Sequence, residues 1–90
     1  MKNALKKYLK KKIVVDTSSS WIYIGNLKNI GENSIELTDV DVHDSKDTTT
    51  TKEIYLVRSK ETGIKSNREN VFINLDYIVS FSPFDKVKQF

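Results

Sequence analysis

The sequence contains one group of side chains of the kinds that bind metal ions, namely Asp39, Asp41, His43 and Asp44. Residues at alternate positions of a β-strand share a face, so the first three would lie together on a regular strand. Two carboxylates and an imidazole could hold a divalent cation. Because the chain has no cysteine and no second histidine, we interpret the group as the exposed end of a strand, and we expect neither a metal site nor a cofactor.

A run of three serines, residues 18–20, is the candidate for nucleophilic catalysis. A serine hydroxyl becomes a nucleophile only beside a general base and near groups that stabilise an oxyanion. His43 is the single histidine, and nothing in the sequence places it near the serines. We therefore expect a protein that is not an enzyme.

Basic residues are concentrated at the N-terminus. Residues 1–12 contain six lysines and no acidic residue, whereas residues 13–90 contain nine basic and twelve acidic residues, a net charge of −3. Lysines bind phosphates through counterion release, so nucleic acid is a candidate partner, with Lys6 and Lys10 among the contacts. The alternative is a solvated helix face.

Aromatic residues and one arginine could add contacts with nucleic acid. Trp21, Tyr23 and Tyr55 could stack on bases, as in proteins that bind single strands. Aromatic residues in strands more often lie in the core or at subunit contacts. Arg68 could contact phosphate, and its alternative is a place in a surface turn.

Residues 70–84 contain a single charged residue, Asp76. Exposed strands usually carry charged residues on the wet face and at a free edge, so we expect another subunit to cover this segment. The sequence has no apolar run long enough to cross a bilayer and no secretory signal. We expect a cytoplasmic protein without a membrane partner.

Hydrophobic periodicity predicts a helix at the N-terminus. Within residues 3–11, lysines flank a stripe formed by Ala4, Leu5, Tyr8 and Leu9. This spacing is typical of a short amphipathic helix, for which Asn3 can serve as the N-cap.

Segments rich in β-branched and aromatic residues predict five strands. They are residues 12–16, 21–30, 33–42, 71–74 and 78–82. Gly25 lies inside the second strand and indicates a bend or the close approach of a neighbouring backbone. Pro83 ends the last strand because it lacks a hydrogen-bond donor, and residues 75–77 form a short connection.

A polar loop over residues 43–51 and a helix over residues 51–63 are predicted between the third and fourth strands. Thr50 and Glu53 can form a capping box, and Gly63 can end the helix. The middle of this segment also suits a strand, and we favour the helix. Residues 63–70 then form a turn.

This order predicts a mainly β fold, a small, strongly bent five-stranded barrel with an N-terminal helix and an inserted helix near residues 51–63. The length of 90 residues suits one domain. Its predicted parts are a basic N-terminal helix over 1–12, the barrel over 13–82 and a C-terminal tail over 83–90.

Two segments resemble the signatures of the Sm-like (LSm) family. YIGNL at residues 23–27, followed by IELTDVDV, resembles the first signature, with Gly25 and Leu27 at its glycine and leucine. INLDYIVSF at residues 73–81 is similar to the second in its apolar spacing. The resemblance, to a divergent bacterial or phage-type member, covers about residues 3–42 and 70–82.

The resemblance implies an Sm-like barrel that closes into a homo-oligomeric ring of about five to seven subunits. In this family the fourth strand of one subunit pairs with the fifth strand of its neighbour. The interface residues that this implies are Val71, Phe72, Ile73, Ile78, Val79 and Phe81.

The resemblance also implies a uridine pocket at the ring pore, at loop positions where this chain has Asn33 and Asn74. The arginine-glycine pair that is usual in the second signature is replaced by Asn74 and Leu75. Asn74 can hydrogen-bond a base or sugar but supplies no cation.

We therefore expect a non-catalytic ring that binds RNA or single-stranded nucleic acid. The expected contacts are Asn33, Asn74, Arg68, Lys6 and Lys10. One alternative is a scaffolding ring whose nucleic-acid site has degenerated, and another is a monomeric barrel that recognises a protein.

Overall fold

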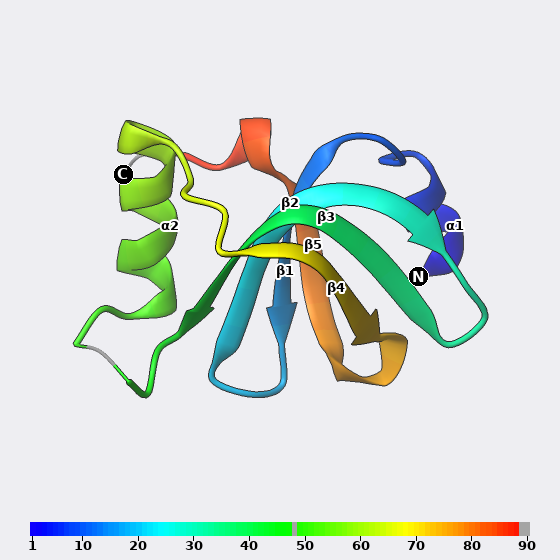
Figure 1. Ribbon diagram of the computed structural model, residues 1–90, viewed down its shortest axis with the longest axis horizontal. Coiled ribbons are helices and arrows are strands. Elements are labelled where there is room, and N and C mark those ends of the chain that lie inside the picture. Colours follow the sequence, from blue (N-terminus) through cyan, green and yellow to red (C-terminus); the bar gives the residue numbers. More distant parts are fainter. Residues whose placement is uncertain (48, 89–90) are drawn as a thin grey trace.

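Five antiparallel strands form one strongly curved sheet in the order β4-β3-β2-β1-β5 (Figure 1). A computed structural model describes residues 1–47 and 49–88; Thr48 of the predicted loop and residues 89–90 of the predicted tail lie outside the described residues. The elements are α1 (Lys2–Lys6), β1 (Lys12–Thr17), β2 (Trp21–Ile30), β3 (Ser34–Asp44), α2 (Lys52–Thr62), β4 (Arg68–Asn74), the 3-10 helix η1 (Leu75–Tyr77), β5 (Ile78–Pro83) and the 3-10 helix η2 (Phe84–Lys86).

The sheet bends where β2 crosses β3 at Gly25. The pairing register shifts between Ile24 and Asn26, and a Cβ atom at Gly25 would lie 3.0 Å from Cγ2 of Val40. Asp39, on the facing strand, has a positive φ of 50°. The close approach of the two strands confirms the prediction made from this glycine.

The strand β4 begins earlier than predicted. Arg68 pairs with Val40 and Asn70 with Thr38, so residues 68–70 belong to the strand and not to the predicted turn. All three side chains are exposed on an edge strand. Exposure on both faces permits polar residues throughout, so the alternation that marks other strands is missing there.

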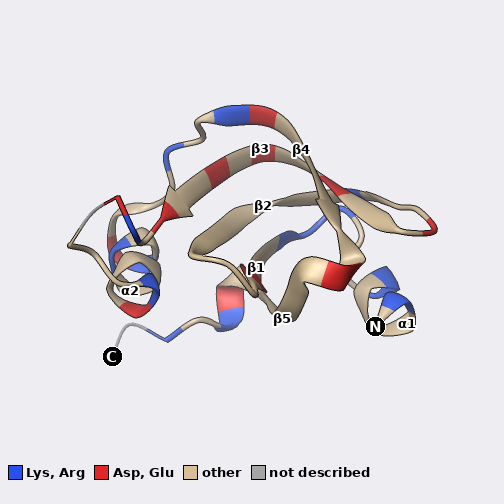
Figure 2. Ribbon diagram, turned by 90° about the horizontal axis from the view of Figure 1, so that it is seen from below, with Lys and Arg blue, Asp and Glu red and all other residues tan. Residues whose placement is uncertain are grey.

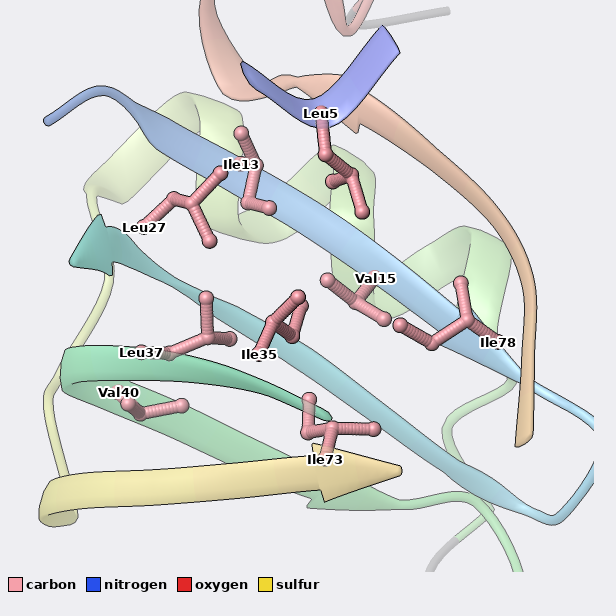
Figure 3. Close-up of a cluster of buried hydrophobic side chains, with 9 residues drawn as sticks. All are labelled: Leu5, Ile13, Val15, Leu27, Ile35, Leu37, Val40, Ile73 and Ile78. Carbon is pink, nitrogen blue, oxygen red and sulfur yellow. The ribbon is translucent and has the colours of Figure 1, made fainter. Parts of the chain in front are cut away.

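Buried side chains form two clusters, one on each face of the sheet. The larger cluster lies inside the curve (Figure 3) and consists of Leu5, Ile13, Val15, Leu27, Ile35, Leu37, Val40, Ile73 and Ile78. The smaller cluster, Val14, Ile22 and Ile24, is covered by residues of α2 and the C-terminal segment, including Tyr55, Leu56 and Phe84. Burial on both faces explains the continuous apolar runs of β1 and β2.

The N-terminal helix is shorter than predicted. It ends at Lys6, and its N-cap is Met1 instead of Asn3. Leu5 enters the larger cluster, and Tyr8 packs edge to face on Phe81 with ring centroids 5.8 Å apart. The chain leaves the helix to reach β2, where the N–H of Lys10 donates to the carbonyl of Leu27 at 2.7 Å.

The inserted helix α2 confirms the preference for a helix over a strand. Its N-cap is Thr51, whose hydroxyl accepts from the Ile54 N–H at 3.2 Å, in place of the predicted Thr50. Gly63 ends the helix with a φ of 83°. No helix in the described part of the chain is long and apolar enough to cross a membrane.

Candidate nucleic-acid interface

The two predicted pocket residues, Asn33 and Asn74, meet at one corner of the sheet. Ser34 is the partner of Asn74 in the β3–β4 register, and the carbonyl oxygen of Asn33 accepts from the Leu75 N–H at 2.8 Å. The Oδ1 atom of Asn74 accepts from the Asp76 N–H at 2.9 Å and caps η1. Among the described residues the Nδ2 group of Asn74 has no partner, so it is available to a ligand.

A groove of about 470 Å³ opens beside Asn74. Its lining combines aromatic rings with hydroxyl and carboxamide groups, from Thr17, Ser19, Tyr23, Phe72, Ile73, Asn74 and Tyr77. The N–H of Ser18 donates to the carbonyl of Tyr77 at 2.9 Å and joins the β1–β2 turn to η1. Rings that stack and polar groups that read base edges are the means by which proteins bind unpaired bases.

Tyr23 lines this groove and is also influenced by the charge of Arg68. Burial raises the pKa of Tyr23, and the positive charge of Arg68 partly opposes that shift, so the hydroxyl is neutral near pH 7. Arg68 lies at the far end of β4 from Asn74, six residues away, which is roughly 20 Å along a strand. Arg68 is therefore absent from the Asn33–Asn74 corner, although it is near enough to Tyr23 to influence its pKa.

The lysine-rich segment lies at the same end of the molecule as the Asn33–Asn74 corner. Hydrogen bonds from Lys10 N–H to the Leu27 carbonyl and from Leu27 N–H to the Lys11 carbonyl fasten the segment to β2. Figures 1 and 2 both show α1 beside the β2–β3 turn, and the lysine positions of α1 are blue on the ribbon of Figure 2. Lys6 and Lys10 are exposed, and within the described residues neither forms an ion pair.

The acidic group of β3 is not arranged as a metal site. The positive φ of Asp39 interrupts the alternation that would align it with Asp41 and His43. Asp44 accepts from the Ser20 hydroxyl at 2.6 Å and from the Lys46 N–H at 3.0 Å, which lower its pKa. Over residues 1–47 and 49–88, no three side chains of the metal-binding kinds come together.

The single histidine is held against α2. The ring of His43 stacks on Tyr55, with centroids 4.4 Å apart and planes 5° apart. Its Nε2–H donates to the Thr50 carbonyl at 3.0 Å, which assigns the proton to that nitrogen. The stacked Tyr55 ring also packs against the smaller cluster, and both rings line a pocket of about 290 Å³ that shares no residue with the groove beside Asn74. Trp21 remains partly exposed at the start of β2.

The serines of residues 18–20 have structural hydrogen bonds. The hydroxyls of Thr17 and Ser19 lie 2.8 Å apart, and the Ser20 hydroxyl donates to Asp44. Within the described residues none of them is hydrogen-bonded to the His43 ring.

Of the six predicted interface residues, two have mostly exposed side chains in the subunit. Phe72 of β4 is 68% exposed and Val79 of β5 is 63% exposed. The side chains of Ile73 and Ile78 are buried in the larger cluster, against which Val71 and Phe81 also pack. Any role of these four at a subunit contact would therefore depend mainly on their backbones.

Three groove residues were not among those predicted from the sequence: Thr17, Ser19 and Tyr77. In the sequence the serine run indicates at most a nucleophile, and Tyr77 belongs to a short connection. Thr17 and Ser19 lie at or just after the end of β1, and Tyr77 lies just before β5. Only the pairing of β1 with β5 brings these residues together, and the sequence does not show that pairing.

Comparison with known proteins supports the fold. No family model matches the sequence, and no curated protein matches it. Among solved structures, the chain is similar to the Sm protein of Pyrococcus abyssii in complex with a uridine heptamer, with a TM-score of 0.61 and 14% identity. The similarity covers 90% of this chain and 93% of that chain. The chain has an Sm-like fold, as predicted.

Proposed function

We propose that this chain is a non-catalytic RNA-binding protein that acts as a homo-oligomeric ring. The observation that carries the proposal is the groove beside Asn74, where aromatic rings, hydroxyl groups and the Asn74 carboxamide line one space. The uridine heptamer bound to the Sm protein of Pyrococcus abyssii supports RNA as the ligand class. Because the sequence lacks cysteine, we keep the cytoplasm as the proposed location.

Recognition of an unpaired base would use the groove. The Nδ2 group of Asn74 can donate to a carbonyl oxygen of uracil, and the Tyr23 hydroxyl can donate or accept. The ring of Tyr77, which is 59% exposed, offers a surface on which a base can stack. These contacts require a base that has left a helical stack, so single-stranded RNA is the preferred ligand.

Affinity for the phosphates would come from exposed basic groups outside the groove. These are Lys6 and Lys10 in and after α1, and Arg68 at the start of β4. Exposed lysines of this kind bind phosphates without reading sequence. Binding should therefore weaken as salt increases, because neutralised phosphates release counterions.

The ring would form by pairing β4 of one subunit with β5 of the next. These are the two edges of the sheet, and each presents unpaired backbone groups. Phe72 and Val79 place exposed apolar side chains at those edges, and residues 71–82 contain no lysine, arginine or glutamate. The contact joins two different surfaces, so repeated copies close a ring when the rotation per subunit permits.

A titration of fluorescent oligouridine at low salt tests the RNA-binding function. We expect the wild-type chain to bind the oligomer and to lose affinity steeply when salt is added. Absence of binding at low salt would overturn the function.

A scaffolding ring is the second candidate. It is favoured by the loss of the usual arginine-glycine pair, because Asn74 brings no cation and Leu75 packs against the larger cluster. It predicts the same oligomer without RNA affinity. A mass of 10.4 kDa in solution would contradict both ring functions and support the monomeric barrel.

A further inference from the structure

The inserted helix α2 reaches the wall of the groove through its first residue, Lys52. The ammonium group of Lys52 donates to Oδ1 of Asp16 at 2.5 Å, to the carbonyl of Ser19 at 2.8 Å and to the carbonyl of Thr17 at 3.2 Å. An ammonium group has three donors, so all three are occupied. The ammonium group of Lys52 is thus fully hydrogen-bonded to β1 and the β1–β2 turn, and it has no donor left for a phosphate.

The β1–β2 turn, to which Lys52 donates these hydrogen bonds, also lines the groove. Thr17 and Ser19 line it directly, and the N–H of Ser18 holds the carbonyl of Tyr77, which lies opposite. The hydroxyl of Thr17 donates to the Trp21 carbonyl at 2.7 Å and closes the turn. Two carbonyl oxygens and one carboxylate face the ammonium group, and without a cation these acceptors would turn toward water.

A second connection ties the insertion to the same turn. Both the N–H and the hydroxyl of Ser45 donate to the Ser20 carbonyl at 3.0 Å. The hydroxyl of Ser20 donates in turn to Asp44, at the end of β3. The segment that precedes α2 and the helix itself thus hold the β1–β2 turn from two sides.

We propose that Lys52 is a positioning residue for the groove, so that the insertion sets the geometry with which a base is bound. This inference rests on the proposed function. The remaining contacts of α2 are separate from this role, because Tyr55 and Leu56 attach the helix to the smaller cluster. Replacement of Lys52 should therefore leave the helix in place while the turn loses its fixed position.

The test compares a uridine heptamer with an abasic heptamer that has the same phosphates. For Lys52→Met we expect a loss of about three- to tenfold in uridine heptamer affinity, the size of a lost hydrogen bond. The affinity for the abasic oligomer and the salt dependence should stay unchanged, because Lys52 does not contact phosphate. Lys52→Arg keeps donors for the turn and should restore most of the preference.

Lys60→Met is the matched control. It makes the same change on the same helix, where the Lys60 ammonium group donates to the Phe84 carbonyl at 3.0 Å, away from the groove. Its preference for uridine should equal that of the wild type. Backbone amide resonances of Ser18 and Ser19, recorded without RNA, should shift in Lys52→Met and not in Lys60→Met.

The outcomes separate the two proposals. If the wild type prefers the uridine heptamer and Lys52→Met keeps that preference, the positioning role is wrong and the proposed function stands. Unchanged Ser18 and Ser19 resonances would also overturn the positioning role, whatever the RNA result. If the wild type binds both oligomers equally, base recognition fails, and the inference fails with it.

Discussion

The carbonyl oxygen of Asn33 accepts a hydrogen bond from the N–H of Leu75 at 2.8 Å. This bond joins the β2–β3 turn to the β4–β5 connection, two loops that are far apart in the sequence. It places Asn74 at the shared corner, with its side-chain oxygen occupied by the Asp76 N–H and its amino group free among the described residues. The amino group of Asn74 can therefore donate to a ligand while the hydrogen bonds that hold this corner stay in place.

Asn74→Ser tests base recognition at this corner. The serine hydroxyl can still cap η1, but the shorter side chain cannot place a donor where Nδ2 of Asn74 lies. We expect about a three- to tenfold loss of uridine heptamer affinity with little change in the thermal unfolding midpoint, measured by fluorescence anisotropy and circular dichroism. Unchanged affinity would remove Asn74 from the site.

Loss of charge on the α1 side tests the phosphate contacts. Lys10 has a positive φ of 69°, which asparagine tolerates well, so the variant is Lys6→Gln combined with Lys10→Asn. The slope of log affinity against log salt should fall by about 0.7 for each lost phosphate contact. The control, Lys46→Gln with Lys65→Gln, removes equal charge elsewhere. Equal effects in both variants would show that only net charge matters.

A lysine placed on either edge strand should prevent assembly. Phe72→Lys and Val79→Lys put a charge where a neighbouring strand would pair, and both positions are exposed in the subunit, so the monomer should remain folded. Light scattering should give a mass near 10.4 kDa. Ile54→Lys is the matched control, because Ile54 is 45% exposed on α2 and away from both edges. An unchanged oligomer in both edge variants would contradict this pairing.

Gly25→Ala should destabilise the bend in the sheet. The added Cβ would lie 3.0 Å from Val40 Cγ2, 3.2 Å from the Thr38 carbonyl and 3.3 Å from Leu37 Cβ. Overpacking of this kind costs about 1–3 kcal/mol. Urea unfolding measures the change, and a variant as stable as the wild type would show that β2 and β3 separate without cost.

Tyr55 should make the protein less stable in alkali. Burial, followed by the negative charge of Asp41, raises the pKa of the Tyr55 hydroxyl well above its usual range. A raised pKa stabilises the fold below the unfolded value of about 10, and this contribution is lost as pH rises above it. Between pH 10 and 12 the free energy of unfolding should fall less steeply in Tyr55→Phe, by up to about 1.4 kcal/mol per pH unit. If the free energy of unfolding falls with pH at the same rate in the wild type and in Tyr55→Phe, the raised pKa of Tyr55 is contradicted.

Local patterns were sufficient to predict much of the fold. The three strands of the meander follow from their β-branched and aromatic runs, and the bend follows from Gly25. Helix α2 follows from its polar N-terminal residues and from Gly63. In each case the signal lies within about ten residues of the element it specifies, and tertiary contacts reinforce it.

Other features depend on contacts that no local pattern contains. The apolar stripe at the N-terminus predicts a helix over residues 1–12, yet the helix ends at Lys6 and the backbone of Lys10 bonds to Leu27 of β2. Arg68 and Asn74 are both predicted contacts for nucleic acid, and only the extent of β4 shows that they lie at opposite ends of one strand. The hydrogen bonds from Lys52 to the β1–β2 turn join residues more than thirty positions apart. They could not be predicted without the topology.

Native mass spectrometry of the chain mixed with a uridine heptamer tests the central claim most directly. The account predicts a single ring, with a mass of about five to seven times 10.4 kDa, that carries bound heptamer. A ring of the same mass that never carries RNA would contradict the RNA-binding function. A species of 10.4 kDa without RNA would contradict the whole account.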